Sequence, residues 1–138
     1  MSVNVLMVDD NKDMCRLIKD VLGEKDFTVW IADNSDDGFR LFQNNAFDIM
    51  IVDYTLPGSM NGLELMKAAL KRQSSIKILL ISAGCSDNVK KSALEMGACG
   101  FLAKPFNLMQ LAGILMHYIG SQNRNRANFG NLSNTAGA

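Results

Sequence analysis

The sequence predicts an α/β fold: a doubly wound, five-stranded parallel sheet with helices on both of its faces. Five short apolar runs recur along the chain, and segments with apolar residues at three-and-four spacing lie between them. Runs that are apolar at consecutive positions are typical of strands buried on both faces, as parallel strands are. Strict alternation of strands and helices needs crossover connections, which place helices on either side of the sheet.

The five predicted strands are the apolar runs themselves. They cover residues 5–8, 27–31, 49–52, 76–81 and 99–103. The third run, Ile-Met-Ile-Val, stops directly on a carboxylate at Asp53. An acidic residue at the end of a buried strand indicates a functional role for its carboxylate.

The first two helices are predicted from an apolar stripe and from a capping residue. The stripe of the first helix precedes Gly23 and comprises Met14, Leu17, Ile18, Val21 and Leu22. The second helix begins at Asn34 or Ser35, whose side-chain oxygens can accept from free backbone donors.

The last three helices follow the third, fourth and fifth strands. The third and fourth are predicted over residues 62–71 and 86–96, and the fifth opens at Asn107 in a relative of the capping box. The apolar stripe of the fourth helix comprises Val89, Ala93 and Leu94.

Composition bounds the class of protein. The chain has 138 residues and 48% hydrophobic content, which predicts one domain over residues 1–120 with an adequate core. Residues 121–138 are rich in Asn, Gly, Ser and Arg without periodicity, so we interpret them as a disordered tail or the start of a linker. The charges of the 14 basic and 14 acidic residues cancel, so we expect no direct binding to nucleic acid.

The cysteine content and the N-terminal residues indicate where in the cell the protein is expected. Three scattered cysteines, Cys15, Cys85 and Cys99, predict neither a disulfide framework nor a zinc site, and they favour a reducing, cytoplasmic setting. We interpret Cys85 as a small loop residue rather than a redox centre. The first apolar run is far too short for a signal peptide or a membrane span, so no membrane attachment is expected.

Polar side chains follow four of the five predicted strands. In an open α/β sheet, ligands bind beyond the carboxyl ends of the strands. The residues delivered to that edge are Asp9, Asp10, Asp53, Ser82, Lys104 and Pro105. Three crowded carboxylates repel one another, and a hard divalent cation relieves that repulsion. Oxygen ligands favour Mg²⁺, with Mn²⁺ possible, and beside such a cation Asp53 becomes a usable nucleophile toward phosphorus.

Five motifs in order resemble one known family, the receiver domains of two-component response regulators. The motifs are VDD at residues 8–10, VDYTLP at 52–57, NG at 61–62, ISA at 81–83 and GACGFLAKPF at 97–106. The likeness covers residues 4–119. It implies the flavodoxin-like (β/α)5 receiver fold and a regulatory domain that catalyses only its own phosphorylation and slow dephosphorylation.

The resemblance also implies roles for single residues. Asp53 would accept a phosphoryl group from the phosphohistidine of a sensor histidine kinase or phosphotransfer protein. The metal would be held by Asp10, Asp53 and the backbone carbonyl of Thr55, with Asp9 acting partly through water. Lys104 would bridge the acceptor carboxylate to the phosphoryl group.

The same resemblance implies a conformational switch. Ser82 and Phe101 would be the switch pair, and the surface of the fourth helix, fifth strand and fifth helix would change shape. Ala83 and Pro105 would set the geometry of their loops, with the bond before Pro105 in the cis form. The partner is then a downstream protein or a missing C-terminal output domain, and the chain is a monomer or weak dimer.

Two departures from the family pattern carry expectations of their own. The sequence between Leu56 and Asn61 is one residue longer than the commonest family loop, which predicts altered access for metal or kinase. Phe101 stands where the family often has tyrosine, so its rotation would act through packing alone.

Two other functions stay open. A phosphate-independent interaction domain could keep the fold, although the intact acid set disfavours it. A phosphohydrolase of the haloacid dehalogenase type also uses a strand-end aspartate, but it needs a second acid two residues later, where Thr55 stands.

Overall fold

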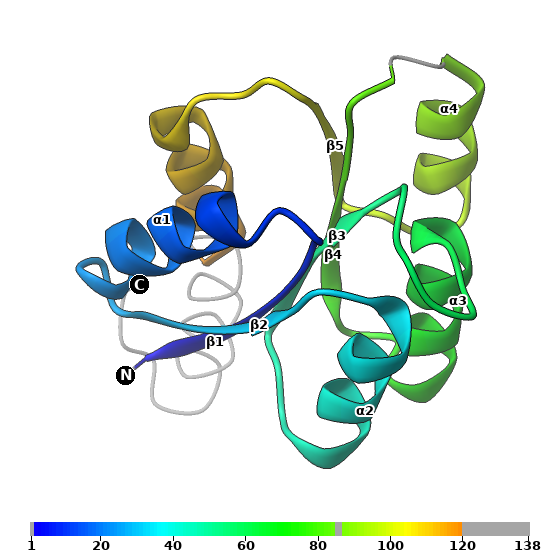
Figure 1. Ribbon diagram of the computed structural model, residues 1–138, viewed down its shortest axis with the longest axis horizontal. Helices are drawn as coiled ribbons and strands as arrows, with labels where there is room; N and C mark the ends of the chain where they lie inside the picture. The colour runs from blue at the N-terminus through cyan, green and yellow to red at the C-terminus, as the bar shows by residue number, and fades with distance from the viewer. Residues whose placement is uncertain (1, 85–86, 120–138) are drawn as a thin grey trace, which may run out of the picture. The chain divides into compact units, whose positions relative to one another are not determined.

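One parallel five-stranded sheet organises the computed structural model, which describes residues 2–84 and 87–119 (Figure 1). The strand order is β2-β1-β3-β4-β5, and all four pairings are parallel. The strands are β1 Val3–Val8, β2 Phe27–Ala32, β3 Ile49–Asp53, β4 Lys77–Ser82 and β5 Gly100–Ala103. The predicted fold class, a doubly wound α/β receiver fold, is confirmed.

Helices alternate with the strands as predicted. They are α1 Lys12–Gly23, α2 Ser35–Asn44, α3 Gly62–Arg72 and α4 Asp87–Glu95. The chain divides into two compact units, Met1–Phe106, which holds the sheet and these helices, and Asn107–Ala138, in which residues 108–119 are helical.

Among the helices that the structure describes, asparagine caps four. Asn11, Asn34 and Asn61 cap α1, α2 and α3, each accepting a hydrogen bond from the backbone N–H three residues later. Asn107 does the same in the second unit, accepting from the Gln110 N–H. Such a cap contributes on the order of 1 kcal/mol, because it satisfies a backbone donor that the helix cannot. For α2 the sequence left open whether Asn34 or Ser35 is the N-cap. The structure shows that Asn34 is the N-cap and that Ser35 is the first residue of the helix.

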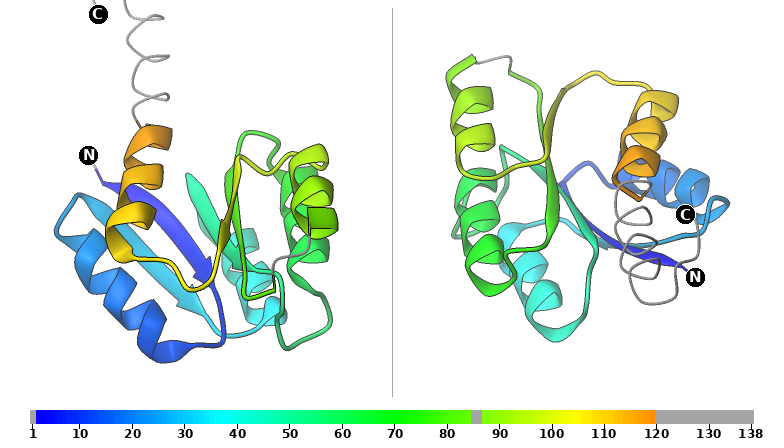
Figure 2. Two further views of the ribbon diagram at one scale, coloured as in Figure 1. Left: turned by 90° about the horizontal axis from the view of Figure 1, so that it is seen from above. Right: turned by 180° about the vertical axis from the view of Figure 1, so that it is seen from behind.

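Helices cover both faces of the sheet within the first unit (Figures 1 and 2). On one face α2, α3 and α4 pack against a continuous apolar cluster that includes Phe42, Leu65 and Ala93. On the other face α1 presents its buried residues Cys15, Ile18 and Leu22. The two layers exclude water from the sheet and leave the strand ends as the place where polar groups can gather.

The central and edge strands differ in burial. β3 lies between β1 and β4, and all five of its residues are buried, including Asp53 at its end. β2 lies at the edge, and Thr28 and Trp30 on it are exposed. The prediction that every strand is buried on both faces is therefore wrong for β2, because Thr28 and Trp30 alternate with the buried Phe27 and Val29 and so share one exposed face of this strand.

Two leucines assigned to apolar stripes are exposed. Leu17 of α1 is 53% exposed and Leu94 of α4 is 44% exposed. Each lies one position from a buried residue, Ile18 or Ala93, and so about 100° away around the helix. The stripe of α1 is instead completed by Cys15, which the prediction left out.

Two expectations concern residues outside the described part of the chain. The predicted tail over residues 121–138 and the interpretation of Cys85 both lie there. The domain boundary at residue 120 therefore stays a prediction. Among the residues that are described, the helices are all too short or too polar to cross a membrane.

Gly62 lets the start of α3 lie directly against the end of β3. A Cβ at this position would lie 2.3 Å from the Asp53 carbonyl oxygen and 2.6 Å from the Tyr54 Cα. We expect Gly62→Ala to lower the free energy of unfolding by about 1–3 kcal/mol, because backbone atoms must move to admit the methyl group. Urea denaturation measures the change.

A second glycine provides the matched control. Gly113 is helical, and a Cβ there would meet nothing within 4 Å. Gly113→Ala should raise the free energy of unfolding by up to about 1 kcal/mol, since alanine is the better helix former. Equal effects of the two substitutions would contradict the close approach at Gly62.

Candidate functional site at the carboxyl edge of the sheet

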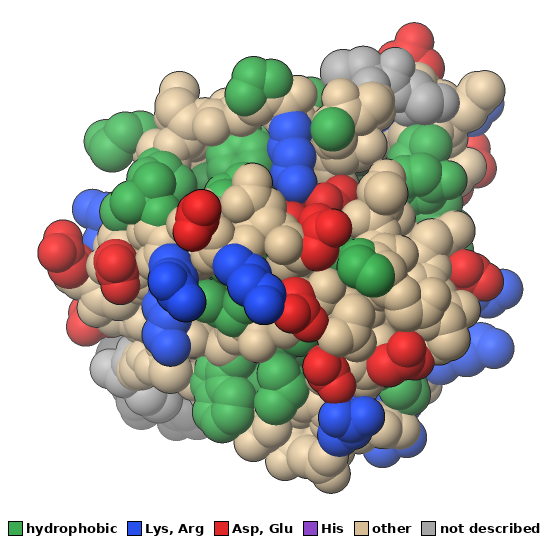
Figure 3. Space-filling view, viewed as in Figure 1, with side chains coloured by type: hydrophobic (Ala, Val, Ile, Leu, Met, Phe, Trp, Pro, Cys, Tyr) green, Lys and Arg blue, Asp and Glu red, His purple; other side chains and the backbone are tan. Residues whose placement is uncertain are grey.

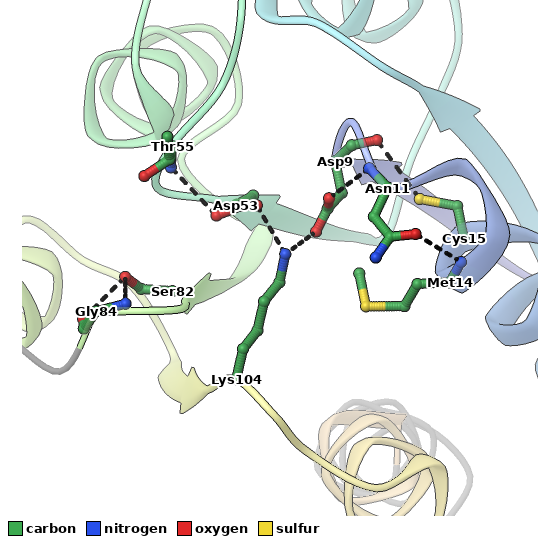
Figure 4. Close-up of polar contacts among 9 residues, drawn as sticks. All are labelled: Asp9, Asn11, Met14, Cys15, Asp53, Thr55, Ser82, Gly84 and Lys104. Atoms are coloured by element: carbon green, nitrogen blue, oxygen red, sulfur yellow. Dashed lines mark hydrogen bonds and ion pairs between the residues drawn. The ribbon is translucent and has the colours of Figure 1, made fainter.

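Three strand ends bring two acids and a lysine into contact (Figure 4). Asp9 follows β1, Asp53 ends β3 and Lys104 follows β5. The Lys104 Nζ lies 2.8 Å from Oδ2 of Asp9 and 2.8 Å from Oδ2 of Asp53. The two carboxylates are buried and the lysine side chain is 19% exposed, so this ion-pair cluster is largely shielded from water.

The ammonium of Lys104 is held charged by these acids. Burial lowers its pKa, but the hydrogen bonds to Asp53 and Asp9 and the attraction of both carboxylates outweigh burial, so the pKa lies above its usual value. Removal of the ammonium would leave two buried carboxylates without a counter-charge, which is costly in a protein interior. Lys104 is therefore the counter-charge that permits two acids to be buried side by side.

Backbone amides orient both carboxylates. Oδ1 of Asp9 accepts a hydrogen bond from the Asn11 N–H at 2.9 Å, and Oδ1 of Asp53 accepts one from the Thr55 N–H at 3.1 Å. Both are local turns in which an aspartate binds the backbone two residues on. Each acid thus presents one oxygen to its own loop and the other to Lys104.

A third acid makes the site strongly negative. Asp9, Asp10 and Asp53 each place a carboxylate oxygen within 4.8 Å of the others, and Asp10 is exposed. Acidic side chains gather near the centre of the face shown in Figure 3, where β1 and β3 end. One ammonium cannot balance three carboxylates, so the cluster retains a net negative charge.

The residues present fit a hard divalent cation. Oxygen donors are what Mg²⁺ prefers, and here they come from three carboxylates on two neighbouring strand ends. Oδ2 of Asp9 is buried and lies 2.8 Å from the Lys104 Nζ, so a single ammonium is shared by oxygens of two acids. A divalent cation among the three carboxylates would supply the positive charge that one ammonium does not.

Ser82 ends the neighbouring strand but points away from the acids. Its hydroxyl donates to the Gly84 carbonyl oxygen at 3.0 Å, and the Gly84 N–H lies 3.3 Å from the same hydroxyl oxygen (Figure 4). Ala83 between them is exposed. Ser82 thus ends β4, and its hydroxyl is occupied by its own loop, so its role at the site stays a prediction.

The remaining predicted residues lie around this cluster. Phe101 is half-buried on β5 and packs against the apolar cluster on the α4 side of the sheet. The peptide bond between Lys104 and Pro105 is cis. Thr55 is exposed, so its carbonyl group is on an accessible loop.

Cys15 lies at the site although the sequence analysis did not assign it there. Its Sγ approaches the Asp9 carbonyl oxygen at 3.6 Å, and the side chain is fully buried. Burial first, and then the negative charge of Asp9, raises the pKa of the thiol to about 12. Its helical spacing from Ile18 and Leu22 was the available signal.

Comparison with known proteins identifies the same family as the motifs do. The model of the response regulator receiver domain matches residues 5–115. A curated relative, the uncharacterized transcriptional regulatory protein YcbL of Bacillus subtilis, is 31% identical over 106 residues, which are 77% of this chain and 46% of that protein. The chain therefore spans about half the length of this relative.

Two solved structures are similar over nearly the whole chain. A CheY-like response regulator receiver domain protein from Methanospirillum hungatei has a TM-score of 0.85 at 25% identity, covering 91% of this chain and 99% of that one. A response regulator protein from Burkholderia pseudomallei has a TM-score of 0.76 at 26% identity, covering 92% of this chain and 75% of that one. The latter structure contains a phosphorylated aspartic acid, a calcium ion and citrate.

Asp10 is predicted to repel its neighbours when no divalent cation is present. With EDTA at low ionic strength, Asp10→Asn should raise the free energy of unfolding by about 1 kcal/mol, because like charges about 4 Å apart repel by that amount close to water. Asp13→Asn is the control, because Asp13 lies in the first turn of α1 and favours the helix dipole. The control should be neutral or destabilising, and a loss of stability in Asp10→Asn would contradict the repulsion.

Cys15 is predicted to resist alkylation in the folded protein. Thiolate is the reactive form, and both burial and the raised pKa oppose it. With iodoacetamide at pH 8, peptide mapping should find exposed Cys99 modified and Cys15 intact, whereas both should react in urea. Equal modification of the two thiols in the native protein would show that Cys15 is accessible.

Proposed function

This chain belongs to the response regulator receiver domain family, and from that premise we propose that it is a phosphorylation-dependent switch of a two-component system. Asp53 accepts the phosphoryl group. The observation that carries the proposal is the position of its carboxylate, which ends the central strand with one oxygen on Lys104 and the other on the Thr55 N–H. The phosphorylated aspartic acid in the Burkholderia neighbour supports the same chemistry.

The step is a transfer of one phosphoryl group from a phosphohistidine. The nitrogen–phosphorus bond of the donor breaks, the imidazole nitrogen keeps the electron pair, and a carboxylate oxygen of Asp53 forms the new bond to phosphorus. Lys104 then donates to a phosphoryl oxygen, since its Nζ already lies at hydrogen-bonding distance from Asp53. The family is regulatory, so the chain catalyses its own modification rather than turning over a substrate.

Mg²⁺, or Mn²⁺ in its place, is the proposed cofactor. Asp9, Asp10, Asp53 and the carbonyl of Thr55 would hold it, as their oxygen donors and proximity suit a hard cation. When bound, the cation offsets the negative charge of the acids and of the phosphoryl oxygens.

Phosphorylation is proposed to turn two side chains. The hydroxyl of Ser82 leaves the Gly84 carbonyl and binds the new phosphoryl group, and Phe101 moves inward behind it. Because Phe101 packs against the apolar cluster on the α4 side, its movement alters the surface of α4 and β5. The new dianion thereby biases a two-state element.

The proposed partners follow from the family. The receiver is proposed to be cytoplasmic, and a sensor histidine kinase or phosphotransfer protein supplies the phosphoryl group. A downstream protein or an output domain reads the altered surface, and the receiver itself works as a monomer or weak dimer without binding nucleic acid.

Intact-protein mass after incubation with Mg²⁺ and acetyl phosphate tests the acceptor. We expect a gain of one phosphoryl mass in the native chain and none in Asp53→Asn. Asp48→Asn is the matched control, because Asp48 precedes the same strand at its other end and binds the Asn4 N–H. It should be phosphorylated like the native chain.

Chelation of the metal provides the second arm of this test. EDTA should abolish the adduct, because the acids then repel the incoming anion. An adduct that persists in Asp53→Asn would move the acceptor to another residue. A native chain that neither binds Mg²⁺ nor gains mass would instead favour a phosphate-independent interaction domain.

A further inference from the structure

The inference starts from a buried hydroxyl that the proposed function does not use. Among the residues that the structure describes, four polar or charged side chains are buried: Asp9, Ser35, Asp53 and Ser82. Three of them form the site at the strand ends. Ser35 is the fourth, is 0% exposed, and lies in the first turn of α2. A polar group so deeply buried needs a partner.

The partner of Ser35 is the loop over residues 54–61, which joins β3 to α3. The Ser35 N–H donates to the Pro57 carbonyl oxygen at 2.9 Å, and the Ser35 hydroxyl accepts from the Met60 N–H at 3.0 Å. The loop therefore lies against the first turn of α2 (Figures 1 and 2). Ser35 binds it on both sides of Gly58.

Gly58 shows how tightly the loop closes over this hydroxyl. Its φ is +113°, and a Cβ there would lie 2.4 Å from the Ser35 Oγ. A side chain at residue 58 would displace the loop from Ser35. Next to this buried contact, exposed Asp36 accepts hydrogen bonds from the backbone and side chain of Ser59.

The same loop is held at its two ends. The Gly62 N–H donates to the Tyr54 carbonyl oxygen at 2.8 Å, and the Thr55 N–H donates to Asp53 Oδ1. Thr55 thus lies along the chain between the end of β3 and the two loop residues, Pro57 and Met60, that are hydrogen-bonded to Ser35. The extra loop residue inferred from the sequence falls in the part that binds α2.

From this arrangement we infer that Ser35 is a positioning residue for the metal site. By holding Pro57 and Met60 on α2, it fixes the loop that presents the Thr55 carbonyl beside Asp53. The inference rests on the proposed function, in which that carbonyl is a Mg²⁺ ligand. It deepens that function, because it assigns control of metal affinity to a helix that carries no ligand.

Ser35→Ala removes the acceptor of the part-buried Met60 N–H. We expect about ten-fold weaker Mg²⁺ binding by isothermal titration calorimetry, the scale found when groups that orient metal ligands are removed. At saturating Mg²⁺ the maximal rate of phosphorylation by acetyl phosphate should stay near the native rate. The variant should therefore need a higher Mg²⁺ concentration for half-maximal phosphorylation. A general loss of stability would not produce this change.

Gln73→Ala is the matched control. Gln73 donates one side-chain hydrogen bond to the Phe47 carbonyl oxygen, so its loss costs stability without touching the loop. Its Mg²⁺ affinity should equal the native value. Gly58→Ala pushes the loop away from Ser35 without replacing any residue of α2, and it should weaken Mg²⁺ binding as Ser35→Ala does. This second variant keeps the test valid if Ser35→Ala folds poorly.

Hydrogen exchange of the metal-free protein gives a separate readout. Ser35→Ala should speed exchange of the Met60 amide at least about ten-fold while β3 stays protected, since the Met60 N–H loses its acceptor. Native Mg²⁺ affinity in Ser35→Ala, or an equal loss in Gln73→Ala, would overturn the inference while leaving phosphorylation of Asp53 intact. A native chain without Mg²⁺ binding or phosphorylation would overturn the proposed function and this role with it.

Discussion

The charge balance between Lys104 and two buried aspartates is the constraint around which this domain is arranged. Asp9 and Asp53 are buried close together, and the ammonium that lies 2.8 Å from each offsets their mutual repulsion. That contact joins the ends of β1, β3 and β5, three strands that are separated in sequence. The apolar layers on both faces of the sheet keep water from competing with it, and so the core and the charge cluster depend on each other.

The loops at this edge are held by backbone hydrogen bonds rather than by side-chain bulk. Each aspartate accepts from the amide two residues later, and asparagine caps begin the helices that follow β1 and β3. Gly62 then allows α3 to start in contact with the strand it follows. A frame of this kind fixes where the carboxylates of Asp9 and Asp53 lie.

The sequence allowed the fold and most of the candidate site to be predicted, because both depend on signals that are local. Apolar runs locate the strands, and the residue that ends each run locates the carboxyl edge, which is why Asp9, Asp53 and Lys104 could be placed together. Leu17 was misplaced because the spacing of apolar residues shows that a helix has an apolar face but not which residues at the edge of that face are buried in the core. The contacts of Ser35 could not be predicted, since they join a helix start to the backbone of a distant loop, and no periodicity encodes a backbone acceptor.

The order in which the cluster's charges occur along the chain bears on cooperativity. Both buried acids are supplied by the first half of the sequence, and Lys104 comes 51 residues after Asp53, behind an edge strand that pairs with β4 alone. A partly folded chain with β1 and β3 paired but β5 detached would hold two carboxylates together without their counter-charge. Repulsion raises the free energy of that species relative to both the native and the unfolded chain. The site that suits phosphoryl chemistry therefore also penalises partial structure and brings folding closer to an all-or-none transition.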